Sequence, residues 1–143
     1  MRILFAVDIR ESDLDRRMDD AVGWAKKLDG TLDLLFVTPE FADSRYTGTD
    51  YARLHREVQS ILHRMRLDLE ELQQRIPEQH RGDVEVATAP RTGEAIVERA
   101  ENYGLLLLHT HGRTGLSQFF LGSVAERVVR ISKGPTLVLP APE

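Results

Sequence analysis

Hydrophobic residues along this chain fall into two kinds of segment, short continuous apolar runs and longer stretches with helical spacing. Five short runs are bounded by polar or turn-forming residues, which is typical of strands buried inside a sheet. Between them, apolar residues recur every three or four positions, which predicts amphipathic helices. The predicted strands cover Ile3–Val7, Thr31–Val37, Asp83–Thr88, Leu105–Leu108 and Pro135–Leu139.

The first predicted helix begins at a cap formed by Ser12 or Asp13 and stops at Gly30. Its charged positions, among them Arg17 and Asp20, are expected on a solvated face. A loop over residues 38–50 precedes a long second helix, whose nine apolar positions predict a stripe packed on the sheet. The remaining predicted helices cover residues 51–76, 94–100 and 123–132.

Strands that alternate with helices predict an α/β fold. Each pair of parallel strands needs a crossover connection, and the crossover helices cover both faces of the sheet. The pattern therefore predicts a three-layer sandwich around a five-stranded parallel sheet. A length of 143 residues suits a single domain over 1–143.

Composition narrows the function classes. The chain has no cysteine, which excludes disulfides, thiolate metal sites and cysteine redox chemistry. Its 19 basic and 23 acidic residues give a net charge of −4, which disfavours nucleic acid as a partner. No apolar run approaches the roughly 20 residues of a membrane span, and the amino-terminal run is too short for a signal peptide. We expect a cytoplasmic protein with no membrane partner.

The stretch from Gly104 to Val129 carries the candidate chemistry. Four consecutive leucines form a buried strand, residues 110–115 hold two glycines and an arginine, and a helix begins at about Gly122 and Ser123. A strand, a glycine-containing loop and a helix amino-terminus bring backbone N–H groups and the positive end of a helix dipole together. This order predicts an anion site, and phosphate is the natural ligand.

The same stretch resembles the nucleotide-binding signature of the universal stress protein family. That signature is a glycine, two residues, a glycine, nine residues, then a glycine and a serine or threonine. Gly112, Gly122 and Ser123 match it, and His109 stands in place of the leading glycine. Further similarity covers nearly the whole chain, in the segments ILFAVD, LLFV, THGRTGL, LGSVAERV and GPTLVLP.

The resemblance implies a Rossmann-like fold of the adenine nucleotide alpha hydrolase type, with strand order 3-2-1-4-5. It implies ATP, or AMP or ADP, as the ligand, with Mg²⁺ as an optional companion. It also implies a homodimer in which the strand Pro135–Leu139 pairs with its copy, so that an otherwise unpaired edge is covered. The nucleotide-binding positions carried over are Ala6, Val7, Asp8, Val37, His109, Gly112, Arg113, Gly122, Ser123 and Val124.

Two functions remain open. One is an ATP-binding stress-response module that signals through its dimer, and the retained Gly112, Gly122 and Ser123 favour it. The other is a nucleotide-free interaction module whose pocket is blocked by His109. If nucleotide binds, the His109 ring is expected to swing aside and donate to a phosphate.

Other chemistries fit less well. The chain lacks the P-loop motif and the first-turn dinucleotide motif. Asp8, His109 and His111 form a weak candidate for a metal site. Arg113 is as compatible with a solvated loop side chain as with a phosphate partner. No catalytic constellation is evident, so the sequence predicts slow ATP hydrolysis at most.

Overall fold

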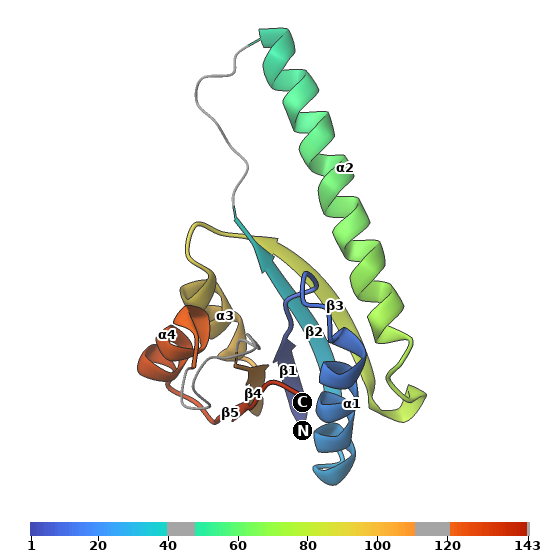
Figure 1. Cartoon of the computed structure of the whole chain (residues 1–143), viewed down its shortest axis with the longest axis vertical. Coiled ribbons are helices and arrows are strands. Elements are labelled where there is room, and N and C mark those ends of the chain that lie inside the picture. Colours follow the sequence, from blue (N-terminus) through green and yellow to red (C-terminus); the bar gives the residue numbers. More distant parts are fainter. Residues whose placement is uncertain (40–47, 111–120, 143) are drawn as a thin grey trace.

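The computed structural model describes residues 1–39, 48–110 and 121–142. Its strands form one parallel sheet in the order β3-β2-β1-β4-β5, which confirms the predicted fold and strand order (Figure 1). The elements are β1 (Arg2–Ala6), α1 (Leu14–Lys27), β2 (Thr31–Thr38), α2 (Gly48–Gln73), the 3-10 helix η1 (Glu78–His80), β3 (Arg81–Thr88), α3 (Thr92–Ala100), β4 (Leu105–His109), α4 (Ser123–Ile131) and β5 (Thr136–Leu139).

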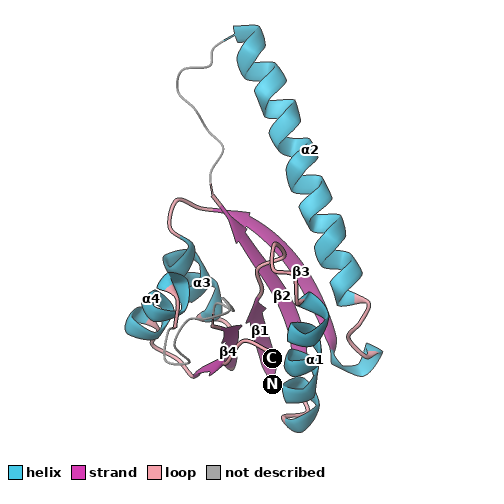
Figure 2. Cartoon of the chain, in the orientation of Figure 1, coloured by secondary structure: helices cyan, strands magenta, loops and turns pink. Residues whose placement is uncertain are grey.

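Helices cover both faces of the sheet, α1 and α2 on one and α3 and α4 on the other (Figure 2). The centre of strand β2, residues 34–37, is continuously apolar because both of its faces are covered. Leu34 and Phe36 pack with α1 and α2, whereas Leu35 and Val37 pack with α3 and α4. Every position of the strand centre therefore has a helix against it, as expected of a central strand in a parallel sheet.

Strand β4 is one residue longer than predicted. His109 pairs with Leu139 of β5, so the strand continues past its four leucines. The histidine is thereby held in the sheet, and the connection to α4 begins after it. This placement fixes which face of the sheet the imidazole lies on.

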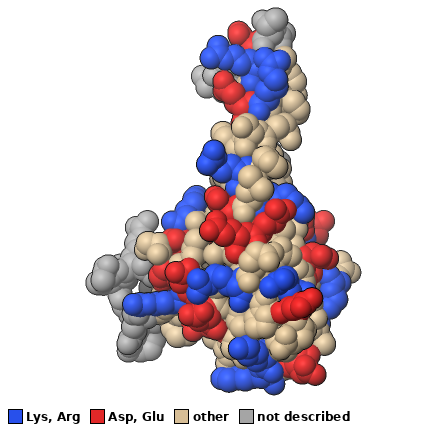
Figure 3. Space-filling model, turned by 90° about the vertical axis from the view of Figure 1, so that its right-hand side faces the viewer, with Lys and Arg blue, Asp and Glu red and all other residues tan. Residues whose placement is uncertain are grey.

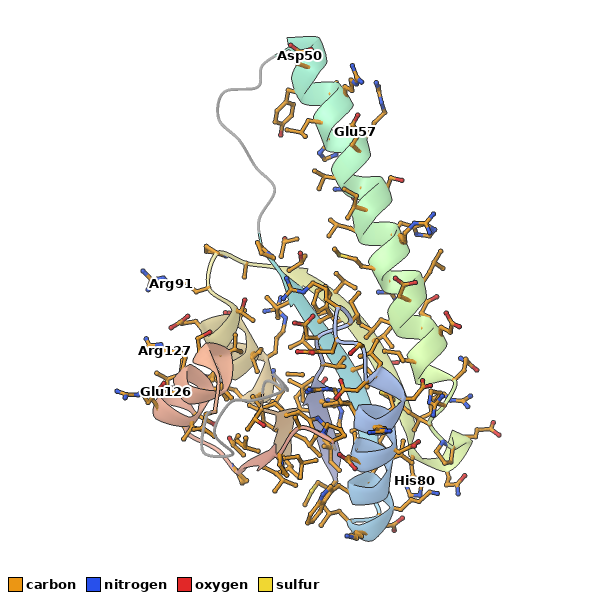
Figure 4. The ribbon with its side chains drawn as sticks, in the orientation of Figure 1. Asp50, Glu57, His80, Arg91, Glu126 and Arg127 are labelled. Carbon is orange, nitrogen blue, oxygen red and sulfur yellow. The ribbon has the colours of Figure 1, made fainter. Side chains whose placement is uncertain are left out.

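The prediction that the apolar stripe of α2 packs on the sheet holds only for the carboxyl-terminal part of the helix. A helix of 26 residues is about 39 Å long, whereas the eight residues of β2 rise about 26 Å. Leu69 and Leu72 are buried, but Tyr51 is exposed, and the end that carries Asp50 and Glu57 stands clear of the body (Figures 3 and 4).

One polar network lies at the amino ends of the strands. The buried Asp33 carboxylate of β2 accepts hydrogen bonds from Arg2 Nη2 at 2.8 Å, the Tyr103 hydroxyl at 2.6 Å and the Asp83 N–H at 2.9 Å. Burial, together with the bond to Asp33, raises the pKa of Tyr103 to about 12, so its hydroxyl stays a donor. The network joins β1, β2 and β3 to the turn before β4, at the end opposite the pocket.

Candidate functional site

A pocket opens at the carboxyl ends of β1, β2 and β4. In the order 3-2-1-4-5 the chain leaves β1 and β4 in opposite directions, and a crevice forms where these connections diverge. The pocket walls come from these strand ends and from α1, α3 and α4. The predicted residues that line it are Ala6, Val7, Asp8, Val37, His109, Gly122 and Val124.

Three other predicted residues are placed differently. Ser123 is the first residue of α4 and is exposed beside the pocket, outside its lining. Gly112 and Arg113 lie outside the described residues, as does His111 of the weak metal candidate. In the described ranges, no group of three or more potential ligand side chains could hold a metal ion.

Asp8 follows β1 and is oriented by Arg10. The Asp8 carboxylate accepts a hydrogen bond from the Arg10 backbone N–H at 3.0 Å and from Arg10 Nε and Nη2 at 2.9 Å each. The guanidinium also lies 5.9 Å from the centre of the Phe36 ring, within the range of a cation–π contact. Arg10 was not predicted as a site residue, although an aspartate at a turn commonly accepts a hydrogen bond from the backbone N–H two residues on, as Asp8 does here.

Gly122 caps the start of α4 in a conformation that favours glycine. Its φ of 84° lies in the left-handed region, where a Cβ would be strained. The helix begins at Ser123, as predicted, and its first-turn N–H groups have no acceptor within the helix. The positive end of the α4 dipole therefore lies beside the pocket, where an anion is stabilised.

His109 takes an orientation that the sequence did not predict. Its side chain is 2% exposed and lies on the α1 face, 5.6 Å from the Phe5 ring between centroids. Its Nε2 is 3.0 Å from Asp20 Oδ2 of α1. Burial lowers the pKa of His109 below 6.5, against the opposing effect of Asp20. The imidazole is therefore neutral at pH 7 and bonded to α1, which differs from both the plug and the charged phosphate donor.

Arg17 corrects the expectation that all charges of α1 are solvated. The residue is buried, with Nε donating to Asp13 Oδ1 at 2.6 Å and Nη1 to the Thr110 carbonyl at 3.3 Å. Its Nη2 lies 4.0 Å from Glu11 Oε2, beyond hydrogen-bond distance. The first turns of α1 sit over the carboxyl ends of the strands, so Arg17 becomes part of the pocket wall.

Sequence reasoning missed Arg17 and Asp20 because both fall at polar positions of an amphipathic pattern. The sequence feature that could have pointed to them is His109. A histidine in place of a small glycine at a strand end needs neighbours that accommodate its ring and its ring nitrogens. The helix across that face of the sheet supplies Asp20 as the hydrogen-bond partner.

Comparisons with known proteins show which family the sequence matches and which solved structures share this fold. The profile of the universal stress protein family matches residues 1–140. No curated protein sequence matches the chain. Among solved structures, UspA from Lactobacillus plantarum superposes with a TM-score of 0.73 at 20% identity, over 97% of both chains.

Two further solved structures were determined with ligands. A universal stress protein in complex with cAMP has a TM-score of 0.61 at 22% identity, over 98% of this chain and 96% of that one. The protein from Archaeoglobus fulgidus in complex with dAMP has a TM-score of 0.54 at 15% identity, over 96% of both chains. These likenesses show the shared fold, and the profile covers almost all of the sequence. The chain therefore belongs to the universal stress protein family.

Proposed function

We propose that this protein is an adenine-nucleotide-binding module of the stress response, with ATP in the pocket at the ends of β1 and β4. The observation that carries the proposal is the convergence of seven residues, all carried over from the family resemblance, on one pocket beside the amino-terminus of α4. That convergence matters because the residues come from four separate segments of the chain. Structural relatives in complex with cAMP and dAMP support an adenine nucleotide as the ligand class.

Each part of the pocket suits a part of the nucleotide. Val7 and Val37 offer apolar surface to the adenine ring. Asp8 offers carboxylate oxygens to the base or ribose. Gly122 and the N–H groups of the first turn of α4 hold the phosphates, together with Gly112 and Arg113 of the connecting segment. Mg²⁺ enters as the counter-ion of ATP, and the module binds nucleotide with slow turnover at most.

Signalling through a dimer completes the proposal. Strand β5 is at one edge of the sheet, and all four of its residues are only half-buried. An edge strand exposes unpaired backbone groups that a second copy can cover. Pairing of two β5 strands about a two-fold axis would satisfy both edges at once.

Isothermal titration with ATP tests the proposal. Ser123→Asp places a carboxylate at the start of α4, where it repels phosphate, and should abolish ATP binding. Ser123→Ala should weaken it by about 1 kcal/mol, the size of one hydrogen bond. Ser60→Asp, at an exposed position of α2, makes the same substitution with the same change of charge and should bind ATP as the wild type does.

The titration separates the two functions. ATP binding that is lost in Ser123→Asp and kept in Ser60→Asp supports the nucleotide module. Equal affinity in the wild type and Ser123→Asp would show that the phosphates do not bind at this end of α4. Absence of ATP binding to the wild type would leave the protein as a nucleotide-free interaction module.

A further inference from the structure

Two buried side-chain nitrogens in the described part of the chain have no hydrogen-bond partner, Arg17 Nη2 and His109 Nδ1. Both side chains line the pocket, and they are 5% and 2% exposed. A buried polar atom left unpaired is costly, and native proteins nearly always satisfy such atoms with protein, water or ligand. Two of them in the wall of one pocket indicate a group that is still to be bound.

The chemistry of the two atoms is fixed by their neighbours. His109 Nε2 faces the Asp20 carboxylate, which can only accept, so Nε2 carries the proton. In a neutral imidazole the other nitrogen, Nδ1, is then an acceptor. Arg17 Nη2 is a permanent donor, because a guanidinium is not deprotonated in proteins. The pocket wall therefore offers one donor and one acceptor.

The two side chains are also close together. Arg17 Nη1 donates to the carbonyl of Thr110, the residue that follows His109. The positive charge of Arg17 contributes to the lowered pKa of His109, which keeps its Nδ1 free of a proton. Both groups can thus address a single small substituent of a bound ligand.

A hydroxyl group satisfies both atoms at once, because its oxygen accepts from Arg17 and its hydrogen donates to His109. An ionised phosphate oxygen satisfies Arg17 but has no proton for Nδ1. A methylene or a plain hydrogen satisfies neither atom. The ligand group that fits must therefore both accept a hydrogen bond and donate one, so its charge alone does not decide the choice.

We propose that Arg17 and His109 form a hydroxyl-binding subsite, occupied by a ribose hydroxyl of the nucleotide. The inference rests on the proposed function, since it assigns a part of the nucleotide to a part of that pocket. It makes the protein selective for ribonucleotides over the deoxy analogue that lacks this hydroxyl. Arg17 and His109 act here as specificity residues.

Titration calorimetry with ATP, 2′-deoxy-ATP and 3′-deoxy-ATP tests the subsite. The wild type should bind ATP roughly tenfold more tightly than one of the two analogues, because one hydroxyl with two hydrogen bonds is lost. In Arg17→Met that ratio should fall to about one. Arg16→Met is the matched control, the same substitution at the adjacent exposed arginine, and should keep the wild-type ratio.

His109→Phe provides a second variant should Arg17→Met fail to fold. It keeps an aromatic ring against Phe5 while removing both nitrogens, and it should also reduce the ratio to about one. In the wild type, the nitrogen-15 resonance of His109 Nδ1 should shift when ATP binds. It should stay in place with the analogue that lacks the bonded hydroxyl.

The outcomes distinguish a failure of the hydroxyl-binding subsite from a failure of nucleotide binding itself. Equal affinities of the wild type for all three nucleotides would overturn the subsite, leave nucleotide binding intact and assign water to the two atoms. A ratio unchanged in both Arg17→Met and His109→Phe would show that other residues read the hydroxyl. No binding of any of the three would overturn the proposed function, and the subsite with it.

Discussion

Individual residues of the pocket are held in place by neighbours on other elements. Arg10 donates three hydrogen bonds to the Asp8 carboxylate, and Nε2 of His109 is hydrogen-bonded to the Asp20 carboxylate. Such contacts set the direction of each group before a ligand arrives. Their effect on stability can be measured without any nucleotide.

We expect His109 to make folding stability depend on pH. Its pKa in the folded protein is lowered below 6.5, chiefly by burial, so the unfolded chain takes up the proton first. Its contribution is complete above about pH 6.5 and is lost as the pH falls from there through the folded pKa. Urea unfolding across this range should show a steeper fall for the wild type than for His109→Phe. Parallel pH profiles of the two proteins would contradict this account.

Gly122 should resist substitution. Its φ of 84° strains any residue with a Cβ, so Gly122→Ala should lower the free energy of unfolding by about 1 kcal/mol or more. Gly134→Ala is the matched control, because a Cβ there meets nothing within 4 Å. Urea denaturation of the two variants should separate them. Equal stability would mean that the cap before α4 tolerates a side chain.

At the scale of elements, the sequence predicted which strands and helices exist because burial on both faces leaves continuous apolar runs. Their bounds were harder to predict. His109 belongs to β4 because it pairs with β5, a contact that no local pattern records. The free end of α2 follows from the length of the helix relative to the sheet, and the apolar spacing of that end resembles the spacing of the packed part.

Helix α1 offers a test of local propensity. Gly23 lies in its interior, and a Cβ there meets nothing within 4 Å. Gly23→Ala should therefore raise the free energy of unfolding by about 1 kcal/mol, the difference between the helix propensities of the two residues. At Gly30 a Cβ would lie 2.8 Å from Ile3 Cδ1 and 3.0 Å from the Met1 carbonyl, so Gly30→Ala should destabilise. Urea denaturation should show opposite signs, and a shared sign would contradict the packing described.

Strand β5 carries the prediction about assembly. Val138→Asp introduces a charge into the strand expected to pair with its copy, and it should convert a dimer to a monomer at micromolar concentration. Light scattering measures the mass, and circular dichroism checks that the variant remains folded. A monomeric mass for the wild type would remove the dimer from the proposal.

At the scale of the whole molecule, the pocket results from strand order. The seven predicted residues that line the pocket were predictable because they lie at strand ends and at one helix start, positions that sequence patterns mark well. Arg17 was not, because it occupies a polar position on α1 and becomes buried only when that helix is placed over the ends of β1 and β4.

Among the helices that the structure describes, none has the length and hydropathy of a membrane-spanning segment.

Nucleotide binding in this pocket is tested most directly by a nitrogen–proton correlation spectrum of the labelled protein during titration with ATP. Binding in the pocket at the carboxyl ends of β1 and β4 should shift the backbone amides of Val7, Asp8 and Val37 together with those of Ser123 and Val124 at the start of α4. The amides at the free end of α2 should stay in place and serve as the internal control. Saturable shifts confined to the pocket are the predicted result. An unchanged spectrum at millimolar ATP, or shifts confined to α2 or β5, would contradict nucleotide binding at this site.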